Sequence, residues 1–164
     1  MSQNVAIEVC HLADAAATTG LGRDLAARLL AAQGQAQTRA ALVLLLEGDL
    51  GAGKTTLVQG LAEGLGITEP ITSPTFALAQ HYRGSTANGG ATALVHVDLY
   101  RLEDPAAAEE LLAQEEEEAR ALGAVLAVEW PERLSQAPVG AWRVRLTPGA
   151  RSGGEGRQAL VEVP

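Results

Sequence analysis

Cysteine, aromatic residues and long apolar runs are scarce in this chain of 164 residues. Cys10 is the single cysteine, which excludes an intrachain disulfide and a cysteine metal cluster. Aromatic residues make up 3% of the chain, so leucine, valine and alanine must supply the packing of its core. Neither a secretory signal nor a long apolar span is found, and we therefore predict a cytoplasmic protein that does not enter a membrane.

Positively charged residues are also few in this sequence. The sequence has 12 lysine and arginine residues against 20 aspartate and glutamate residues, which gives a formal net charge of −8 and a pI near 4.8. Such a surface repels the phosphate backbone of nucleic acids. We expect no direct DNA binding, and any role on RNA would need a partner protein.

What the sequence does contain is Gly48-Asp-Leu-Gly-Ala-Gly-Lys-Thr-Thr56, directly after the apolar run 41–47 and directly before a helical pattern. The pattern G-x-x-x-x-G-K-T in this strand–loop–helix context is typical of a phosphate-binding loop, or P-loop. Its glycines let successive backbone N–H groups point inward around anionic oxygens, and the following helix adds the positive end of its dipole. The stretch therefore predicts a nucleotide site.

Two side chains of this loop have predicted roles. Lys54 reaches the β- and γ-phosphates, and the Thr55 hydroxyl is placed to hold Mg²⁺. Lys54 is the only lysine in the chain, so lysine stands where a flexible point charge is needed and a planar guanidinium would fit the loop poorly.

Hydrophobic periodicity predicts an α/β fold, a single P-loop NTPase domain over residues 1–164 with a mixed, mainly parallel central sheet flanked by helices. The connection between strands 76–82 and 92–98 is too short for a crossover helix, so this pair should be antiparallel. The helix after the P-loop should stop at Gly66, and Glu115 to Glu118 should form a solvated helical face. The other expected elements are strands 5–9, 41–47, 124–129, 142–146 and 158–163, and helices 18–33, closed by Gly34, and 105–122.

A P-loop site also needs a carboxylate at the end of a neighbouring strand, to hold Mg²⁺ directly or through water. Asp98 and Glu129 both end predicted strands and would lie at the carboxyl edge of the sheet if those strands run parallel to the P-loop strand. The residue pattern alone does not rank them. His96 alternates with its valine neighbours and is interpreted as structural rather than catalytic.

The loop Ser73-Pro74-Thr75 follows the P-loop helix, where other P-loop ATPases and GTPases carry a segment that senses the γ-phosphate. Thr75 or Ser73 is a candidate donor of a hydroxyl to the metal or the phosphate. An ordinary proline turn is the alternative.

Four segments in this order resemble the TsaE family, the bacterial P-loop ATPases of tRNA threonylcarbamoyladenosine synthesis: 48–56, Ser73-Pro-Thr-Phe76, His96-Val-Asp-Leu-Tyr-Arg-Leu102 and Val128-Glu-Trp-Pro-Glu132. The resemblance covers nearly the whole chain. It implies an ATP-hydrolysing accessory protein that works with TsaB and TsaD to place threonylcarbamoyl on adenosine 37 of tRNAs reading ANN codons. Contact with tRNA would then be indirect, through the complex.

The resemblance also implies roles for individual residues. Thr55 and Glu129 would be the Mg²⁺ ligands, and Asp98 would be needed for hydrolysis. In our interpretation, either Asp98 or a Thr75 loop that orders when the partner complex docks orients the attacking water. Thr18 matches a position near the adenine, and Arg157 matches a late nucleotide contact. ATP itself would be held by Asp49, Leu50, Gly51, Ala52, Gly53, Lys54, Thr55 and Thr56.

Two other functions fit a P-loop. A small-molecule kinase would carry an arginine-rich lid, whereas Arg143, Arg145 and Arg151 are scattered between a strand and a loop. A nucleotide-sensing adaptor would bind ATP without hydrolysing it. A GTPase is less favoured, because the Asn-Lys-x-Asp guanine signature requires a lysine other than Lys54 and the chain has none.

Overall fold

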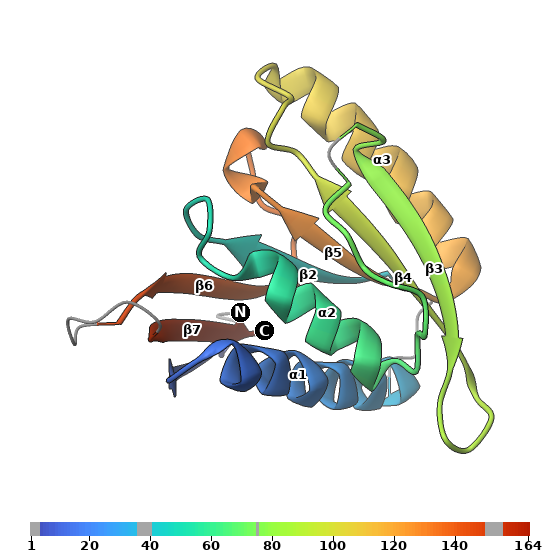
Figure 1. Cartoon of the computed structure of the whole chain (residues 1–164). Coiled ribbons are helices and arrows are strands. Elements are labelled where there is room, and N and C mark those ends of the chain that lie inside the picture. The colour runs from blue at the N-terminus through green and yellow to red at the C-terminus, as the bar shows by residue number, and fades with distance from the viewer. Residues whose placement is uncertain (1–3, 36–40, 75, 150–155) are drawn as a thin grey trace.

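The computed structural model describes residues 4–35, 41–74, 76–149 and 156–164. They form one seven-stranded sheet with helices on both faces (Figure 1), which confirms the predicted mixed α/β class. The elements in chain order are β1 (Ala6–Leu12), α1 (Ala15–Gln35), β2 (Leu42–Glu47), α2 (Lys54–Gly64), β3 (Ala79–Ser85), β4 (Ala91–Asp98), α3 (Pro105–Leu122), β5 (Val125–Glu129), the 3₁₀ helix η1 (Pro131–Arg133), β6 (Trp142–Pro148) and β7 (Arg157–Val163).

The sheet has the strand order β1-β7-β6-β2-β5-β4-β3. Its central strands β6, β2, β5 and β4 run parallel. The flanking strands are antiparallel to their neighbours, including the predicted hairpin of β3 and β4. Parallel strands present their carboxyl ends at the same sheet edge, and the register pairs Asp98 directly with Glu129.

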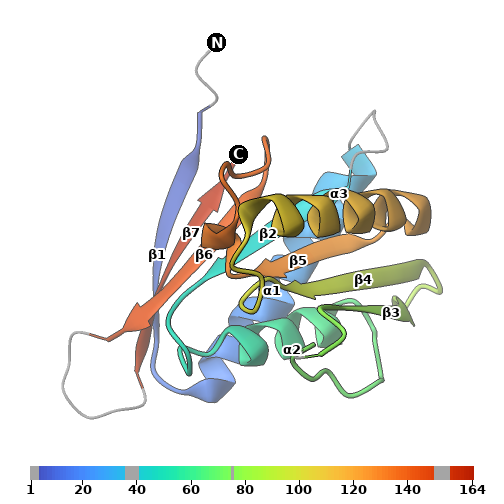
Figure 2. The ribbon, with the colours of Figure 1, turned by 90° about the horizontal axis from the view of Figure 1, so that it is seen from above.

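Each face of the sheet has its own hydrophobic core. α1 and α2 cover one face and α3 covers the other (Figures 1 and 2). In β2, Leu44 and Leu46 pack against α1 and α2, while Val43 and Leu45 pack toward α3. The apolar run in β2 is unbroken because both faces of this central strand are buried.

α1 and α2 approach each other closely through glycine. A Cβ atom on Gly60 would lie 2.1 Å from the Thr19 carbonyl oxygen, and one on Gly22 would lie 2.3 Å from the Leu57 carbonyl oxygen. Real Cβ atoms do not approach other atoms this closely. The two glycines therefore allow the helix backbones to touch, and this brings Thr18 of α1 next to Gly53 of the P-loop.

The first helix is longer than predicted. It begins at Ala15 because Asp14 caps it, with the Asp14 Oδ1 atom accepting a hydrogen bond of 2.8 Å from the Ala17 N–H. It also continues through Gly34 to Gln35, so the prediction that Gly34 ends it was wrong. α2 ends at Gly64, slightly before the predicted stop, and Gly66 follows it with a φ of 72°.

Two strands and one helical face also differ from prediction. β3 begins at Ala79 rather than at residue 76, because Leu78 has a φ of 62° that interrupts the extended chain. β1 runs from Ala6 to Leu12 rather than over 5–9, and Ile7 and Val9 are exposed, since the α3-side core does not reach this edge strand. Glu115 is buried rather than solvated, and its Oε2 atom lies 2.6 Å from His81 Nε2.

None of the helices within the described ranges is long and apolar enough to cross a membrane.

Candidate nucleotide-binding site

The P-loop connects the carboxyl end of β2 to the first turn of α2 and lines a cavity of about 260 Å³. Gly51 and Gly53 have φ angles of 79° and 108°, which favour glycine and let the loop turn back on itself. The cavity is bounded by Leu50, Gly51, Ala52, Gly53, Lys54, Thr55, Thr56, Ser73, Asp98, Glu129 and Trp130. The structure thus brings most predicted phosphate and metal residues together, whereas Asp49 contributes its backbone carbonyl to the loop and Thr75 lies outside the described residues.

Lys54 is folded back against its own loop. Its side chain is 6% exposed, and its ammonium donates hydrogen bonds to the carbonyl oxygens of Gly48 and, at 3.4 Å, of Asp49. Burial lowers the pKa of Lys54, while the negative charges of nearby Glu129, Glu132, Asp98 and Asp49 oppose this shift. Phosphate oxygens are stronger acceptors for an ammonium than peptide carbonyls are. A bound nucleotide would therefore attract the Lys54 ammonium away from the carbonyls of its own loop.

Trp130 is a site residue that the sequence reasoning did not single out. It directly follows Glu129 and has a φ of 60°, a left-handed conformation that costs a non-glycine residue on the order of 1–3 kcal/mol. Its ring packs 4.8 Å from the Tyr100 ring, and Lys54 Nζ lies 4.0 Å from its centroid. These contacts stabilise the strained backbone, and strain of this kind is concentrated at functional sites.

Trp130 should report nucleotide binding. In a Trp142→Phe variant, which leaves Trp130 as the single tryptophan, ATP should change the emission because the Lys54 ammonium leaves the ring. Fluorescence titration measures this change, and Trp130→Phe in place of Trp142→Phe is the matched control, since Trp142 lies in the core near α1. An ATP response from Trp142 alone, with none from Trp130, would contradict the prediction.

The two strand-end carboxylates are held by different partners. Asp98 accepts hydrogen bonds from the Ser73 hydroxyl at 3.2 Å and from the Tyr100 N–H at 2.9 Å. Glu129 is 3% exposed, and its Oε2 atom lies 2.6 Å from His96 Nε2. Both carboxylates line the P-loop cavity, but each is oriented independently of the other.

The donor set of this cavity fits Mg²⁺. The Thr55 hydroxyl and the carboxylates of Asp98 and Glu129 are hard oxygen donors. The described part of the chain contains no cluster of three or more His, Cys, Asp or Glu side chains arranged to hold a metal by themselves. A hydroxyl and two carboxylates suit Mg²⁺, which takes few protein ligands and completes its shell with phosphate oxygens and water.

A second cavity, of about 440 Å³, adjoins the other side of the P-loop. Thr18 and Arg157 both line it, together with Gly51, Ala52 and Gly53. The Arg157 guanidinium donates to the carbonyl oxygens of Ala52 at 3.1 Å and Gly51 at 3.3 Å. Two residues from opposite ends of the chain therefore meet beside the P-loop.

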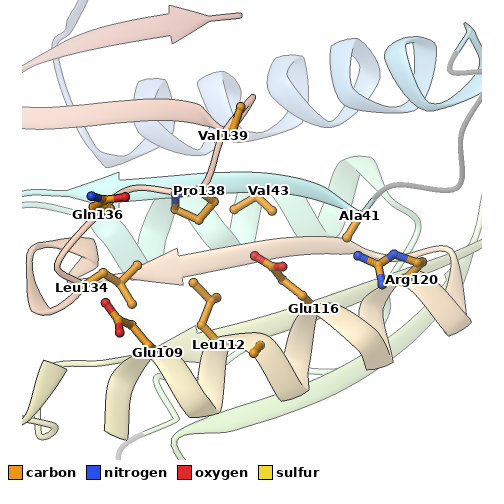
Figure 3. Close-up of a pocket in the computed structure, with 11 residues that line it drawn as sticks. Ala41, Val43, Glu109, Leu112, Glu116, Arg120, Leu134, Gln136, Pro138 and Val139 are labelled. Atoms are coloured by element: carbon orange, nitrogen blue, oxygen red, sulfur yellow. The ribbon is translucent and has the colours of Figure 1, made fainter. Parts of the chain in front are cut away.

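A third hollow, of about 350 Å³, lies on the α3 face and is separate from the nucleotide site. Val43, Leu112 and Pro138 converge on it, with Glu116 and Arg120 at one end (Figure 3). It includes no P-loop residue and neither of the two strand-end carboxylates.

This fold and this loop define a P-loop nucleotide-binding protein. The family model for "Threonylcarbamoyl adenosine biosynthesis protein TsaE" matches residues 12–157, and the chain belongs to this family. The predicted resemblance is thereby confirmed.

Individual relatives agree with this assignment. A TsaE protein of Nostoc sp. is 44% identical over 138 residues, covering 84% of this chain and 76% of the relative. A TsaE protein of Synechocystis sp. is 51% identical over 98 residues, or 58% of each chain. The crystal structure of YdiB from Bacillus subtilis matches with a TM-score of 0.65 and 27% identity, covering 99% of this chain and 88% of that one.

Proposed function

We propose that this protein binds and hydrolyses ATP as an accessory factor in the threonylcarbamoylation of adenosine 37 in tRNAs that read ANN codons. It would act in the cytoplasm with TsaB and TsaD, as a single P-loop domain over residues 1–164, and would meet tRNA only through that complex. The observation that carries the proposal is the P-loop cavity lined with oxygen donors, in a chain of the TsaE family. The acidic net charge of −8 supports indirect contact with tRNA.

The position of each site residue gives it a different proposed role. Residues 49–56 cradle the phosphates, Lys54 pairs with the γ-phosphate, and Thr18 and Arg157 contact the nucleoside end. Thr55 and Glu129 would hold Mg²⁺, which would supply positive charge to neutralise the phosphates. Thr75, which lies outside the described residues, remains a candidate for orienting the attacking water.

Asp98 is the better supported candidate for positioning that water. Its carboxylate is fixed by Ser73 and by the Tyr100 N–H, and carboxylate oxygens keep further lone pairs for a water molecule. Phosphoryl transfer needs positioning and charge stabilisation rather than covalent chemistry, so an oriented carboxylate is sufficient for this role.

Slow hydrolysis by the isolated protein is expected. No arginine is among the described residues that line the phosphate cavity, and a transition-state arginine accelerates phosphoryl transfer by about 10³–10⁵-fold in related systems. Arg143 and Arg145, two of the scattered arginines that do not make a kinase lid, pair with Glu47 at 3.2 Å and 2.8 Å, and the third, Arg151, lies outside the described residues. A partner that docks over the site would then complete it.

The test is phosphate release from ATP by the protein alone and with TsaB and TsaD. We expect partner-stimulated hydrolysis that falls about 100-fold or more in Glu129→Gln and Asp98→Asn, because each removes a charge that acts in the transition state. Glu132→Gln is the matched control, since Glu132 lies nearby but does not line the phosphate cavity.

Each alternative function has its own result in this assay. Tight ATP binding without hydrolysis in any mixture would identify a nucleotide-sensing adaptor. Phosphate that appears on an added metabolite instead of in water would identify a small-molecule kinase.

A further inference from the structure

His96 is the one histidine enclosed completely by the fold. It lies on β4 with 0% exposure, and its Nε2 atom is 2.6 Å from Oε2 of Glu129 on the adjacent strand β5. The contact joins a side chain that the sequence reasoning interpreted as structural to a carboxylate that lines the P-loop cavity.

The chemistry of the two side chains determines which of them donates the hydrogen bond. A carboxylate only accepts hydrogen bonds, so Nε2 carries the proton and donates it to Glu129. Nδ1 of His96 is buried without a hydrogen-bond partner within the described residues. Burying a ring nitrogen without a partner has a free-energy cost, and an apolar side chain at this position in the core would avoid it. The contact with Glu129 is thus the one polar interaction that explains a histidine here.

We propose that His96 is a positioning residue for the metal ligand Glu129. By holding Oε2, it fixes the carboxylate so that Oε1 would be free to bind a divalent cation together with Thr55. No hydrogen bond within the described chain engages Oε1, and Glu129 lines the cavity. This inference rests on the proposed Mg²⁺–ATP site.

By orienting the Glu129 carboxylate before the metal binds, His96 should have a measurable effect on metal affinity. A glutamate has three side-chain torsions, and a freely rotating carboxylate loses conformational entropy when a metal immobilises it. Outer-shell hydrogen bonds to metal ligands commonly change metal affinity by about 10–100-fold. Asp98 is held by Ser73 and Tyr100 instead, so a change at His96 should act on Glu129 alone.

The experiment measures the Mg²⁺ concentration that half-saturates ATP binding, together with ATP affinity in EDTA, by titration calorimetry. His96→Leu removes the donor, and His96→Asn keeps a polar side chain that is too short to reach Glu129, so one of them can be tested if the other fails to fold. Both should need about 10–100-fold more Mg²⁺ while ATP affinity in EDTA stays unchanged. His96→Gln, whose longer side chain carries an amide donor, should recover part of the loss.

A double-mutant cycle separates positioning from packing. In the Glu129→Gln background, His96→Leu should have no further effect on the Mg²⁺ requirement, because the ligand through which it acts is gone. An unchanged Mg²⁺ requirement in folded His96 variants would overturn the proposal, as would an equal loss of ATP affinity with and without Mg²⁺. A wild-type protein that binds ATP without any Mg²⁺ dependence would instead overturn the proposed metal site itself.

Discussion

Replacing Lys54 by methionine should lower ATP hydrolysis in the TsaB and TsaD mixture by about 100- to 1,000-fold, the usual effect of removing one group that stabilises developing charge. Methionine keeps most of the buried stem but has no ammonium for the phosphates. Nucleotide affinity, measured by calorimetry, should fall as well, because the Lys54 charge acts on bound ATP before the transition state is reached. Hydrolysis that survives in this variant would mean that the P-loop lysine is not part of the active site.

Loss of activity should not come from unfolding. Burial lowers the pKa of Lys54, so the folded protein carries a desolvation cost for its ammonium that methionine does not have. We therefore expect the melting temperature at neutral pH to stay within about 4 °C, the shift that ~1 kcal/mol produces in a domain of this size. Circular dichroism melts of both proteins provide the control.

The difference in stability between the wild type and Lys54→Met should depend on pH. Between the depressed folded pKa of Lys54 and its ordinary value of 10.5, the unfolded chain binds more protons than the folded one. The stability of the wild type should therefore rise with pH through this window relative to Lys54→Met. A stability difference that is flat over these pH values would mean that Lys54 is not perturbed by its burial.

Local sequence signals were sufficient to predict those elements whose ends are determined by residues close by in the sequence. α3 was predicted with its observed bounds, because Asp104 caps it by accepting from the Ala106 N–H at 3.0 Å, Pro105 begins it, and Gly123 ends it with a φ of 63°. The phosphate-binding loop is equally local, since its glycines, lysine and threonines are contiguous in the sequence. Both carboxylates that line the cavity were also predicted, because each of them ends an apolar strand pattern.

Features that depend on the order of strands could not be predicted from these signals. Alternation in β4 predicts that His96 faces away from its valine neighbours, but the contact with Glu129 exists because β5 lies beside β4. Likewise, Ile7 and Val9 look like a buried strand face until the edge position of β1 is known. Trp130 was missed because its left-handed backbone is stabilised by Tyr100 and Lys54, which lie far from it in sequence.

The second large effect is expected at Gly60, where the added methyl group of Gly60→Ala would lie 2.1 Å from the Thr19 carbonyl oxygen. The Thr19 carbonyl is helix backbone and the methyl group is fixed directly to the α2 backbone, so the overlap can be relieved only by moving α1 away from α2. Overpacking of this kind costs about 1–3 kcal/mol and occasionally more, and we expect at least the upper value here. For a domain of this size that corresponds to a melting temperature lower by roughly 6–12 °C.

Gly34→Ala is the matched control, because a Cβ atom at this position of α1 would have nothing within 4 Å. Alanine is favoured over glycine in a helix by about 1 kcal/mol, so this variant should be as stable as the wild type or more stable. Gly60→Ala should also weaken ATP binding, since separating the helices draws Thr18 away from Gly53, whereas Gly34→Ala should not. Equal melting temperatures for the two variants would show that α1 and α2 do not meet at Gly60, and the packing that joins Thr18 to the P-loop would then need another explanation.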